Sequence, residues 1–268
     1  MSEALRLERP RAGVVRVVLS RPEVRNAFDD GLIAEVTAAF EQLASDASTR
    51  VVVLAGEGKA FCAGADLTWM KRMVTWGEEE NRRDAEALGR MFLAIDSCPK
   101  PVVGRIHGAA LGGGAGLVAV CDVAVCADGT LLGTTEVRLG IVPAVISPFV
   151  VRKVGESHAR RWFLTGERLD AEAALRAGLV HVVVPEAELD AEVDRVVDAL
   201  LLGGPEALAV SKGLAKRMGR VPTDEALAEA ACIIATRRVS SEGQEGMEAF
   251  LAKRPPAWAP EPGRRSGS

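Results

Sequence analysis

The sequence of 268 residues contains no tyrosine, only four tryptophans and seven phenylalanines, and no block of five consecutive basic residues. Because aromatic residues are scarce, the core has to be built from Val, Leu, Ile and Ala, with 27 glycines allowing close approaches of the backbone. The formal net charge is −4, so the sequence offers no electrostatic footprint for a nucleic-acid backbone. Nucleic acid is therefore not an expected partner.

Signals for a membrane, for secretion and for a metal are missing as well. No apolar run approaches the roughly 18 residues of a membrane-spanning helix, and residues 1–20 lack the basic start and cleavage site of a signal peptide. The five cysteines include no C-x-x-C pair, and the three histidines are scattered. We therefore expect a cytoplasmic protein with free thiols, no metal and no membrane contact.

Strand and helix patterns alternate in the first part of the chain. Apolar and β-branched runs predict strands, and apolar residues at helical spacing predict the helices between them. Strands are expected at 14–19, 51–55, 102–106, 123–127 and 131–133, and helices from 29 or 30 to about 43, up to about 98 and at 113–120. This alternation indicates an α/β fold of repeated β-β-α units.

Beyond residue 145 the pattern is mostly helical. One short strand is expected at 179–183, and helices are expected near 186–203, 205–218, 222–239 and 242–252. The first of these helices carries a long apolar face that would lie partly exposed beside a single α/β core, formed by Val193, Val196, Val197, Leu200 and Leu201. We expect an α/β core over 1–185, a helical region over 186–254 and an irregular tail over 255–268.

Two glycine-containing segments could carry chemistry. The stretch Gly108–Gly116 reads G-A-A-L-G-G-G-A-G, which lacks the Lys-Ser/Thr of a phosphate loop and the glycine spacing of a dinucleotide fingerprint. After a strand, it begins a helix whose first turn has no side chains, so that free backbone N–H groups could bind an oxyanion. The alternative interpretation is that the glycines only permit close helix packing. The segment Phe61–Leu67, F-C-A-G-A-D-L, is a second such transition. Together the two could point two backbone amides at one atom.

The ordered set of motifs resembles the crotonase, or enoyl-CoA hydratase/isomerase, superfamily. Besides the two glycine segments, the resemblance covers R-P-E-V-R-N-A-F (21–28), T-E-V-R-L-G-I-V-P (135–143) and E-G-M-E-A-F-L-A-K-R (245–254). It implies a crotonase-like spiral of β-β-α units with a C-terminal helical region for oligomerisation. It also implies an acyl-CoA thioester substrate and a homotrimer or homohexamer. Coenzyme A enters as part of the substrate, so no separate cofactor is expected.

The resemblance also implies roles for individual residues. The two oxyanion-hole amides fall on Ala65 and Gly113, where they would hold the thioester oxygen. Positions matching segments that contact coenzyme A are Arg25, Ala27, Ala63, Asp66, Leu67 and Gly112, although Asp66 also reads as a helix cap. Phe250 and Lys253 match C-terminal positions that reach a neighbouring subunit's coenzyme A in the family.

Hydratases of this superfamily usually carry two glutamates, and here only one of the two positions has one. The first position is Gly116 and the second is Glu136, which on composition alone would be an ordinary surface carboxylate. One carboxyl group can act twice if it takes a proton from water and returns it to the α-carbon on the same face. The missing side chain at Gly116 predicts room for a branched acyl group.

Within the superfamily, the segments 65–73 and 135–151 look most like bacterial 3-methylglutaconyl-CoA hydratases of leucine breakdown. Such a substrate has a distal carboxylate that requires a cation or several donors. Lys71 and Arg72 are the nearest candidates, and Arg82 and Arg83 lie further along the chain. An exposed basic helix face is the other interpretation of these residues.

Three functions stay open at this point. The first is reversible hydration of a branched enoyl-CoA by a lyase that uses an oxyanion hole and one glutamate. The second is isomerisation of an enoyl-CoA double bond, because family isomerases commonly use one carboxylate at the Glu136 position. The third is a non-catalytic RNA-binding or scaffold role, against which the missing basic stripe and the presence of Glu136 both count.

Overall fold

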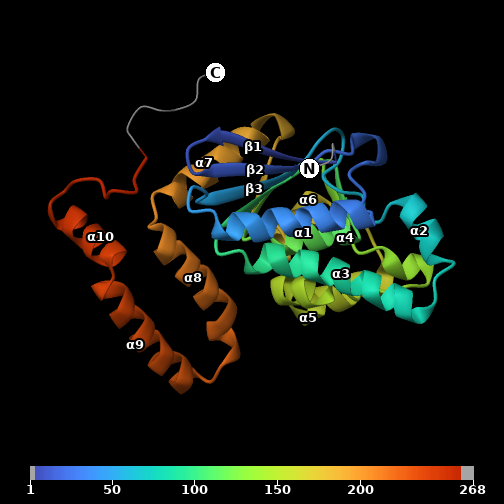
Figure 1. Cartoon of the computed structure of the whole chain (residues 1–268). Coiled ribbons are helices and arrows are strands. Elements are labelled where there is room, and N and C mark those ends of the chain that lie inside the picture. Colours follow the sequence, from blue (N-terminus) through green and yellow to red (C-terminus); the bar gives the residue numbers. More distant parts are fainter. Residues whose placement is uncertain (1–3, 261–268) are drawn as a thin grey trace.

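The computed structural model describes residues 4–260, and its centre is a sheet of six strands (Figure 1). The strands lie in the order β1-β2-β3-β4-β6-β8, where only the β1–β2 pair is antiparallel. Their bounds are Leu5–Arg11 (β1), Val14–Leu19 (β2), Val51–Gly56 (β3), Val102–Ile106 (β4), Val123–Ala127 (β6) and Val182–Val184 (β8). Parallel strands end at the same edge, so the segments that follow β3 and β4 meet there.

A second, smaller set of pairings lies beyond that edge. Strands β5 (Ala109–Leu111) and β7 (Leu131–Gly133) pair in parallel, and a single bridge joins Cys62 to Ala110. Each turn of the chain thus adds one strand to the large sheet and one short segment to the small one. This is the expected repeat of β-β-α units, and the predicted α/β fold is confirmed.

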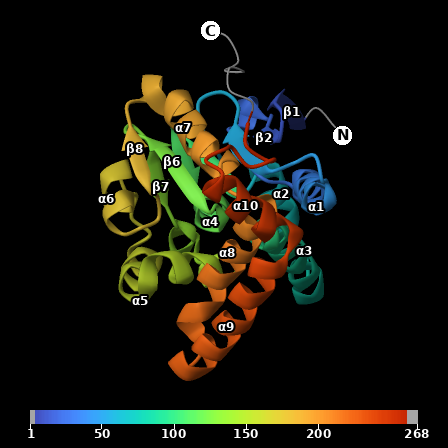
Figure 2. The same ribbon diagram turned by 90° about the vertical axis from the view of Figure 1, so that its left-hand side faces the viewer.

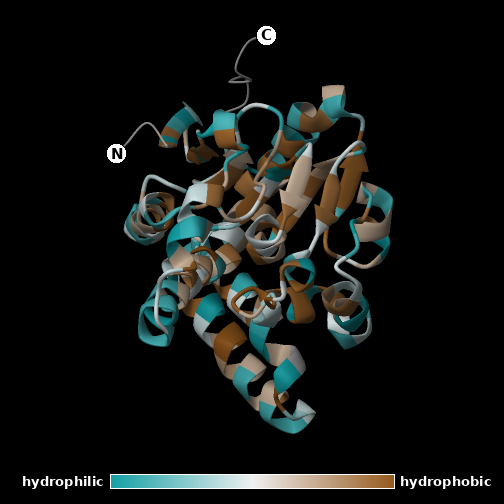
Figure 3. Ribbon diagram, turned by 90° about the vertical axis from the view of Figure 1, so that its right-hand side faces the viewer, coloured by the Kyte–Doolittle hydropathy of each residue, from teal (hydrophilic) through white to brown (hydrophobic). Residues whose placement is uncertain are grey.

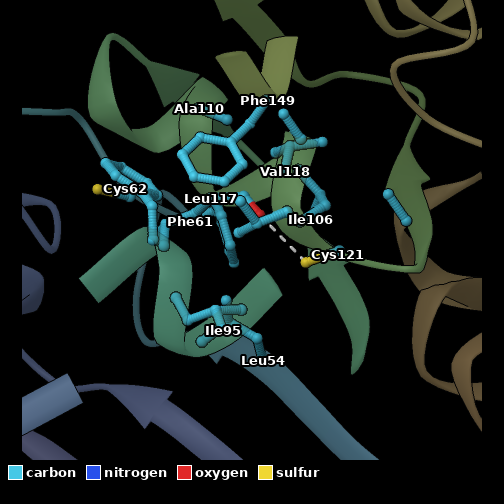
Figure 4. Close-up of a cluster of buried hydrophobic side chains, with 14 of the residues drawn as sticks. Leu54, Phe61, Cys62, Ile95, Ile106, Ala110, Leu117, Val118, Cys121 and Phe149 are labelled. Carbon is cyan, nitrogen blue, oxygen red and sulfur yellow. Dashed lines mark hydrogen bonds between the residues drawn. The ribbon is translucent and has the colours of Figure 1, made fainter. Parts of the chain in front are cut away.

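Four helices cover one face of the large sheet. They are α1 (Asp30–Ser45), α3 (Glu78–Ser97), α4 (Gly113–Val120) and α5 (Ser147–Thr165). Val52 and Leu54 of β3 point into this layer and belong to the main core cluster. Figure 4 shows that core, in which Leu54, Phe61, Ile106 and Leu117 gather around α4. Almost every residue of α4 is buried, which explains why its sequence is apolar all round.

The other face of the sheet is covered by α7 (Leu189–Leu201), which crosses the strands in Figure 2. Its residues Val193, Val197 and Leu201 are buried against Val51 and Val53 of β3 and their neighbours. The expectation that this apolar face lies exposed beside the core is therefore wrong. Helical spacing identifies an apolar face, but it does not say whether the surface that covers it belongs to the same chain.

The last three helices stand to one side of the sheet (Figure 1). They are α8 (Pro205–Arg217), α9 (Thr223–Val239) and α10 (Ser241–Leu251), and their only fully buried residue among those described is Ala249. In Figure 3 the strands carry mostly hydrophobic colours, whereas these outer helices alternate between hydrophilic and hydrophobic positions. Large apolar side chains are left exposed here, at Leu227, Ile234, Val239, Met247, Phe250 and Leu251.

Most predicted elements have the expected positions, with three differences. The strands β1 and β5 were not expected, the helical segment before residue 98 is split into α2 (Leu67–Met73) and α3, and β8 begins three residues later than predicted. A further short helix, α6 (Ala171–Arg176), precedes β8. Residues 255–260 contain no helix or strand, and the rest of the expected tail lies outside the described residues.

The cysteines are unpaired, as predicted, and four of the five are buried. Burial raises the pKa of the Cys62 and Cys121 thiols to about 12 and that of Cys126 to about 11. Their thiolates are therefore scarce at neutral pH, and these residues act as small core side chains. Over residues 4–260, no helix combines the length and the apolarity that crossing a membrane requires.

The space expected at Gly116 is filled. A Cβ atom added to this residue would lie 2.4 Å from Cγ2 of Ile146 and 2.9 Å from the ring of Phe92. The prediction that Gly116 leaves room for a branched acyl group is therefore wrong, because neighbouring core side chains occupy that direction. The glycine allows α4 to pack against α3 and the start of α5.

This packing predicts opposite effects for two helical glycines. Gly116→Ala should lower the free energy of unfolding by about 1–3 kcal/mol, since an extra methyl group overpacks a filled core. Gly213→Ala is the control, because a Cβ there meets no atom within 4 Å. It should raise the free energy of unfolding by about 0.5–1 kcal/mol through helix propensity. Urea unfolding measures both values, and a neutral Gly116→Ala would contradict this account.

Candidate active site

The amide of Ala65 is left free by the way its neighbours are held. Phe28 N–H donates to the carbonyl of Gly64 at 2.7 Å, and Asp66 N–H donates to the carbonyl of Phe28 at 2.8 Å. These two bonds form a parallel bridge between Phe28 and Ala65. Within residues 4–260, the Ala65 amide itself has no acceptor, and the residue is exposed. It can therefore donate to a ligand.

The amide of Gly113 is a second donor. Gly113 begins α4, where the first N–H groups have no partner inside the helix, and the preceding Gly112 has φ +54° and no side chain to cap it. A Cβ on Gly113 would lie 2.6 Å from the ring of Phe28, so only glycine fits. The Gly113 amide, like that of Ala65, has no acceptor among the described residues.

The structure brings these two amides together, as predicted. Gly64, with φ +95°, sits so close to the other loop that an added Cβ would lie 2.8 Å from the carbonyl oxygen of Leu111 and 3.7 Å from the nitrogen of Gly113. Leu111 N–H in turn donates to the carbonyl of Cys62 at 3.1 Å. Two free amides on adjoining loops are the arrangement that an oxyanion hole requires.

Glu136 lies beside this pair. It is the first residue of a short 3-10 helix (Glu136–Leu139) after β7, and its Oε1 is 3.3 Å from the position of a Cβ added to Gly112. Its Oε2 is buried and has no hydrogen-bond partner among the described residues. Desolvation raises the pKa of this carboxyl group, and a backbone hydrogen bond only partly opposes the shift. An unpaired carboxylate with a raised pKa is suited to proton transfer.

Aromatic side chains form an apolar layer behind the site. The ring of Phe28 meets Phe92 edge to face with centroids 6.3 Å apart, and Phe92 lies 5.8 Å from Phe149. All three rings are buried. Electrostatic interactions are stronger beside such apolar surroundings than in water, which favours both oxyanion stabilisation and the raised pKa of Glu136.

Asp66 is used inside the protein. Its carboxylate accepts hydrogen bonds from the amides of Thr68 at 2.7 Å and Trp69 at 3.3 Å, and it pairs with Arg21 at 3.0 Å. The residue is 5% exposed. The interpretation of Asp66 as the cap of α2 is confirmed, and its oxygens are committed to these partners instead of to a ligand.

The other residues expected along coenzyme A lie around the same loops. Arg25 and Asn26 form a left-handed turn, and the carbonyl of Arg25 accepts from the amide of Ala63 at 3.0 Å. The side chain of Arg25 is exposed, Ala27 is buried beneath it, and Leu67 is 75% exposed at the start of α2. An exposed cation and an exposed apolar residue thus flank Ala65.

Phe250 and Lys253 do not join this group within one chain. Phe250 is on α10 and Lys253 follows it, and in Figure 1 α10 lies at the opposite end of the molecule from α2. Phe250 is 82% exposed. Contact with coenzyme A of a neighbouring subunit stays a prediction.

The two nearest candidate cations for a distal carboxylate differ. Arg72 pairs with Asp30 at 2.5 Å, and its guanidinium lies 6.0 Å from the ring centroid of Trp76. Lys71 is exposed and forms no ion pair within residues 4–260. Arg82 and Arg83, the more distant candidates, pair with Glu79 at 2.8 and 3.7 Å. Because these arginines and Arg72 are engaged in ion pairs, Lys71 is left as the available cation of the four.

The remaining titratable residues have structural contacts. His107 is buried with Nε2 2.9 Å from the carbonyl oxygen of Gly58, and His181 Nδ1 accepts from the amide of Ala124. Asp122 accepts from the amide of Val102 at 2.8 Å. These contacts hold the side chains of His107, His181 and Asp122 against the backbone of neighbouring segments.

Two residues of this region were missed from the sequence, Arg21 and Asn26. Asn26 is fully buried, and its side-chain amide donates to the carbonyls of Glu57 at 2.9 Å and Ala60 at 2.8 Å. Its Oδ1 accepts from the amide of Arg21 at 2.8 Å. Both belong to the R-P-E-V-R-N-A-F segment, so their presence in a matching motif was the available signal.

Neither a group of metal ligands nor the cavity beside α8 marks the site. In the part of the chain that the structure describes, no group of three or more His, Cys, Asp or Glu side chains could hold a metal ion. A cavity of about 530 Å³ lies between α8 and the core, lined by residues such as Asp122, Lys153 and Lys212, and includes none of the predicted site residues. The free amides and Glu136 form the candidate active site.

Comparison with known proteins agrees with this geometry. The profile of the family described as enoyl-CoA hydratase/isomerase matches residues 9–261. A Thermus thermophilus protein named as an enoyl-CoA hydratase is 36% identical over 243 residues, which cover 91% of this chain and 96% of that protein. An enoyl-CoA hydratase of Alternaria alternata is 38% identical over 210 residues, 77% of this chain and 67% of its own length.

Solved structures give the same result. An enoyl-CoA hydratase from Shewanella pealeana superposes with a TM-score of 0.91 at 38% identity, covering 95% of this chain and 96% of that one. AtuE of Pseudomonas aeruginosa superposes with a TM-score of 0.92 at 38% identity, covering 96% and 100%. With the oxyanion pair and Glu136 in place, the chain is an enzyme that belongs to the enoyl-CoA hydratase/isomerase family.

Proposed function

We propose that this protein catalyses the reversible hydration of a branched enoyl-CoA with a distal carboxylate, of the 3-methylglutaconyl-CoA type. The observation that carries the hydratase proposal is the single buried, unpaired carboxylate oxygen of Glu136 beside two free amides. The branched, dicarboxylic substrate is supported by the sequence likeness of segments 65–73 and 135–151 and by the unpaired cation Lys71. Gly116 gives it no support, because its side-chain direction is filled.

The geometry allows one carboxylate to carry the whole reaction. The thioester oxygen would accept hydrogen bonds from the amides of Ala65 and Gly113, which draws electrons away from the double bond. Glu136 would take a proton from water as the water oxygen bonds to the β-carbon, and the electron pair would move to the enolate. The carboxyl group would then return the proton to the α-carbon. Water is thus added across the double bond, and Glu136 is regenerated.

An isomerase is the second candidate, because a single carboxylate can also carry a proton between two carbons of one acyl chain. It would use the same oxyanion pair but exclude water. The RNA-binding or scaffold alternative gains no support, since the site contains a desolvated carboxylate beside free amide donors.

The raised pKa of Glu136 predicts a pH dependence. Glu136 acts first as a base, so kcat/KM should fall as the pH drops through a pKa above the ordinary value of 4.5.

Glu136→Gln should lower kcat at least about 10²-fold while substrate still binds. A raised folded-state pKa means that stability is lost as pH rises through it, so Glu136→Gln should also raise the melting temperature at pH 7. A variant with undiminished kcat would exclude Glu136.

Product analysis in ¹⁸O-water separates the two reactions. We expect wild-type enzyme to convert 3-methylglutaconyl-CoA, and crotonyl-CoA less efficiently, to 3-hydroxyacyl-CoA products that carry ¹⁸O on the β-carbon. An isomerase would instead yield an unlabelled enoyl-CoA of unchanged mass. Mass spectrometry of a panel of straight, branched and dicarboxylic enoyl-CoAs makes the measurement. Migration of a 3-enoyl double bond without any label would overturn the hydratase in favour of the isomerase.

The exposed faces of α9 and α10 predict self-association. Phe250, Leu251 and Val239 are each more than three-quarters exposed, and apolar surface of this kind is normally covered. We propose that a neighbouring protomer covers it in a homotrimer, or in a hexamer formed from two trimers. Light scattering should give three or six times the chain mass at micromolar concentration, and Phe250→Ser should weaken the assembly. A stable wild-type monomer would refute the proposal.

A further inference from the structure

The guanidinium of Arg21 lies between the N-terminal caps of two helices. Asp29 caps α1, accepting from the amide of Leu32, and Asp66 caps α2. Nη1 of Arg21 lies 2.9 Å from Oδ2 of Asp29, and Nη2 lies 3.0 Å from Oδ2 of Asp66. Nη1 also donates to the carbonyl of Ala27 at 2.7 Å. The Arg21 side chain is 18% exposed.

These contacts hold both sides of the bridge that carries Ala65. On one side, Ala27 directly precedes Phe28, whose N–H and carbonyl form the bridge. On the other side, Asp66 directly follows Ala65, and its carboxylate is bound both by Arg21 and by the first amides of α2. One planar side chain thus ties the two segments together, next to the peptide that must present its N–H to the thioester oxygen.

We propose that Arg21 is a positioning residue of the oxyanion hole, which fixes the direction of the Ala65 amide without touching substrate. The inference rests on the proposed acyl-CoA chemistry at Ala65 and Gly113. Arg21 acts through geometry, because its guanidinium is balanced by two carboxylates. The group of Arg21, Asp29 and Asp66 carries a net charge of −1, so it supplies no net positive charge to the oxyanion.

The size of the effect follows from how sharply stabilisation of the oxyanion depends on the positions of the donor amides. Amides stabilise an oxyanion when they lie about 2.7–3.1 Å from it, and loss of one donor costs about 10²–10³ in kcat. A displacement of about 1 Å, caused by a change away from the chemistry, can cost about 10²-fold. Loosening the Arg21 contacts should therefore lower kcat without removing the groups that bind coenzyme A.

The kinetic test compares three variants with wild type. Arg21→Met should lower kcat by about 10- to 100-fold and change KM by less than about threefold. Arg21→Lys keeps the charge beside Asp66 but not the planar fork, and should lose about 3- to 10-fold in kcat. Arg9→Met is the matched control, because Arg9 pairs at 2.9 Å with Asp46 at the other end of α1. It should keep wild-type kcat.

A second measurement reads the oxyanion hole without turnover. Acetoacetyl-CoA forms an enolate whose ultraviolet absorbance reports how strongly the bound oxyanion is stabilised. Wild type and Arg9→Met should increase the enolate fraction at a fixed pH, and Arg21→Met and Arg21→Lys should reduce that increase in the same order as their kcat values. Melting curves of every variant confirm that the measured protein is folded, and Arg21→Lys serves if Arg21→Met does not fold.

The outcomes separate the inference from the proposed function. If wild type stabilises the enolate but hydrates no enoyl-CoA, the hydratase proposal fails, and an Arg21-dependent enolate signal still supports the positioning role. Folded Arg21→Lys or Arg21→Met with wild-type kcat and wild-type enolate fraction would overturn the inference. A change in KM alone, or a wild type that leaves the enolate fraction unchanged, would overturn it as well.

Discussion

The site depends on a close approach of two backbone segments that only glycine permits. Gly64 lies against the Leu111 carbonyl and Gly113 against the ring of Phe28, and an added Cβ would collide at either position. Because the proposed oxyanion donors are main-chain amides, their separation is set by the path of the chain. The parallel strands β3 and β4 bring both loops to one edge of the sheet. The arrangement of the two amides therefore requires both the sheet and the glycines.

The same crowding shapes the electrostatics of the site. The ring of Phe28 lies against Gly113 and packs on Phe92, while Glu136 beside Gly112 is desolvated and has no partner on Oε2 among the described residues. Two arginines at the edge of the site are paired with carboxylates, Arg21 with Asp66 and Arg72 with Asp30, whereas Arg25 and Lys71 form no ion pair among the described residues. Inside the site, Oε2 of Glu136 is the buried carboxylate oxygen that these arginines leave without a partner among those residues.

Sequence patterns predicted the central elements well, because fully apolar runs bounded by glycine, proline or aspartate have few alternatives. The bounds of β4, β6, β7 and α4 agree with those expected. Strand β1 was missed because its charged residues mark a sheet edge instead of a buried run. The motifs pointed to the amides of Ala65 and Gly113 and to Glu136, which lie close together in the structure. They could not show whether the space at Gly116 was open, what covered α7, or that Arg21 joins two caps, since each depends on contacts distant in sequence.

The start of α4 has a further consequence for how the protein can evolve. Gly112 has φ +54° and ψ −120°, a conformation that excludes the serine, asparagine or aspartate which would normally cap a helix. The start of this helix therefore has no side-chain cap, and in the proposed reaction the thioester oxygen would take the place of the missing cap. Selection for a more stable unliganded protein would favour a side chain that caps the start of α4. That side chain would occupy the place of the thioester oxygen, so the protein would inhibit itself.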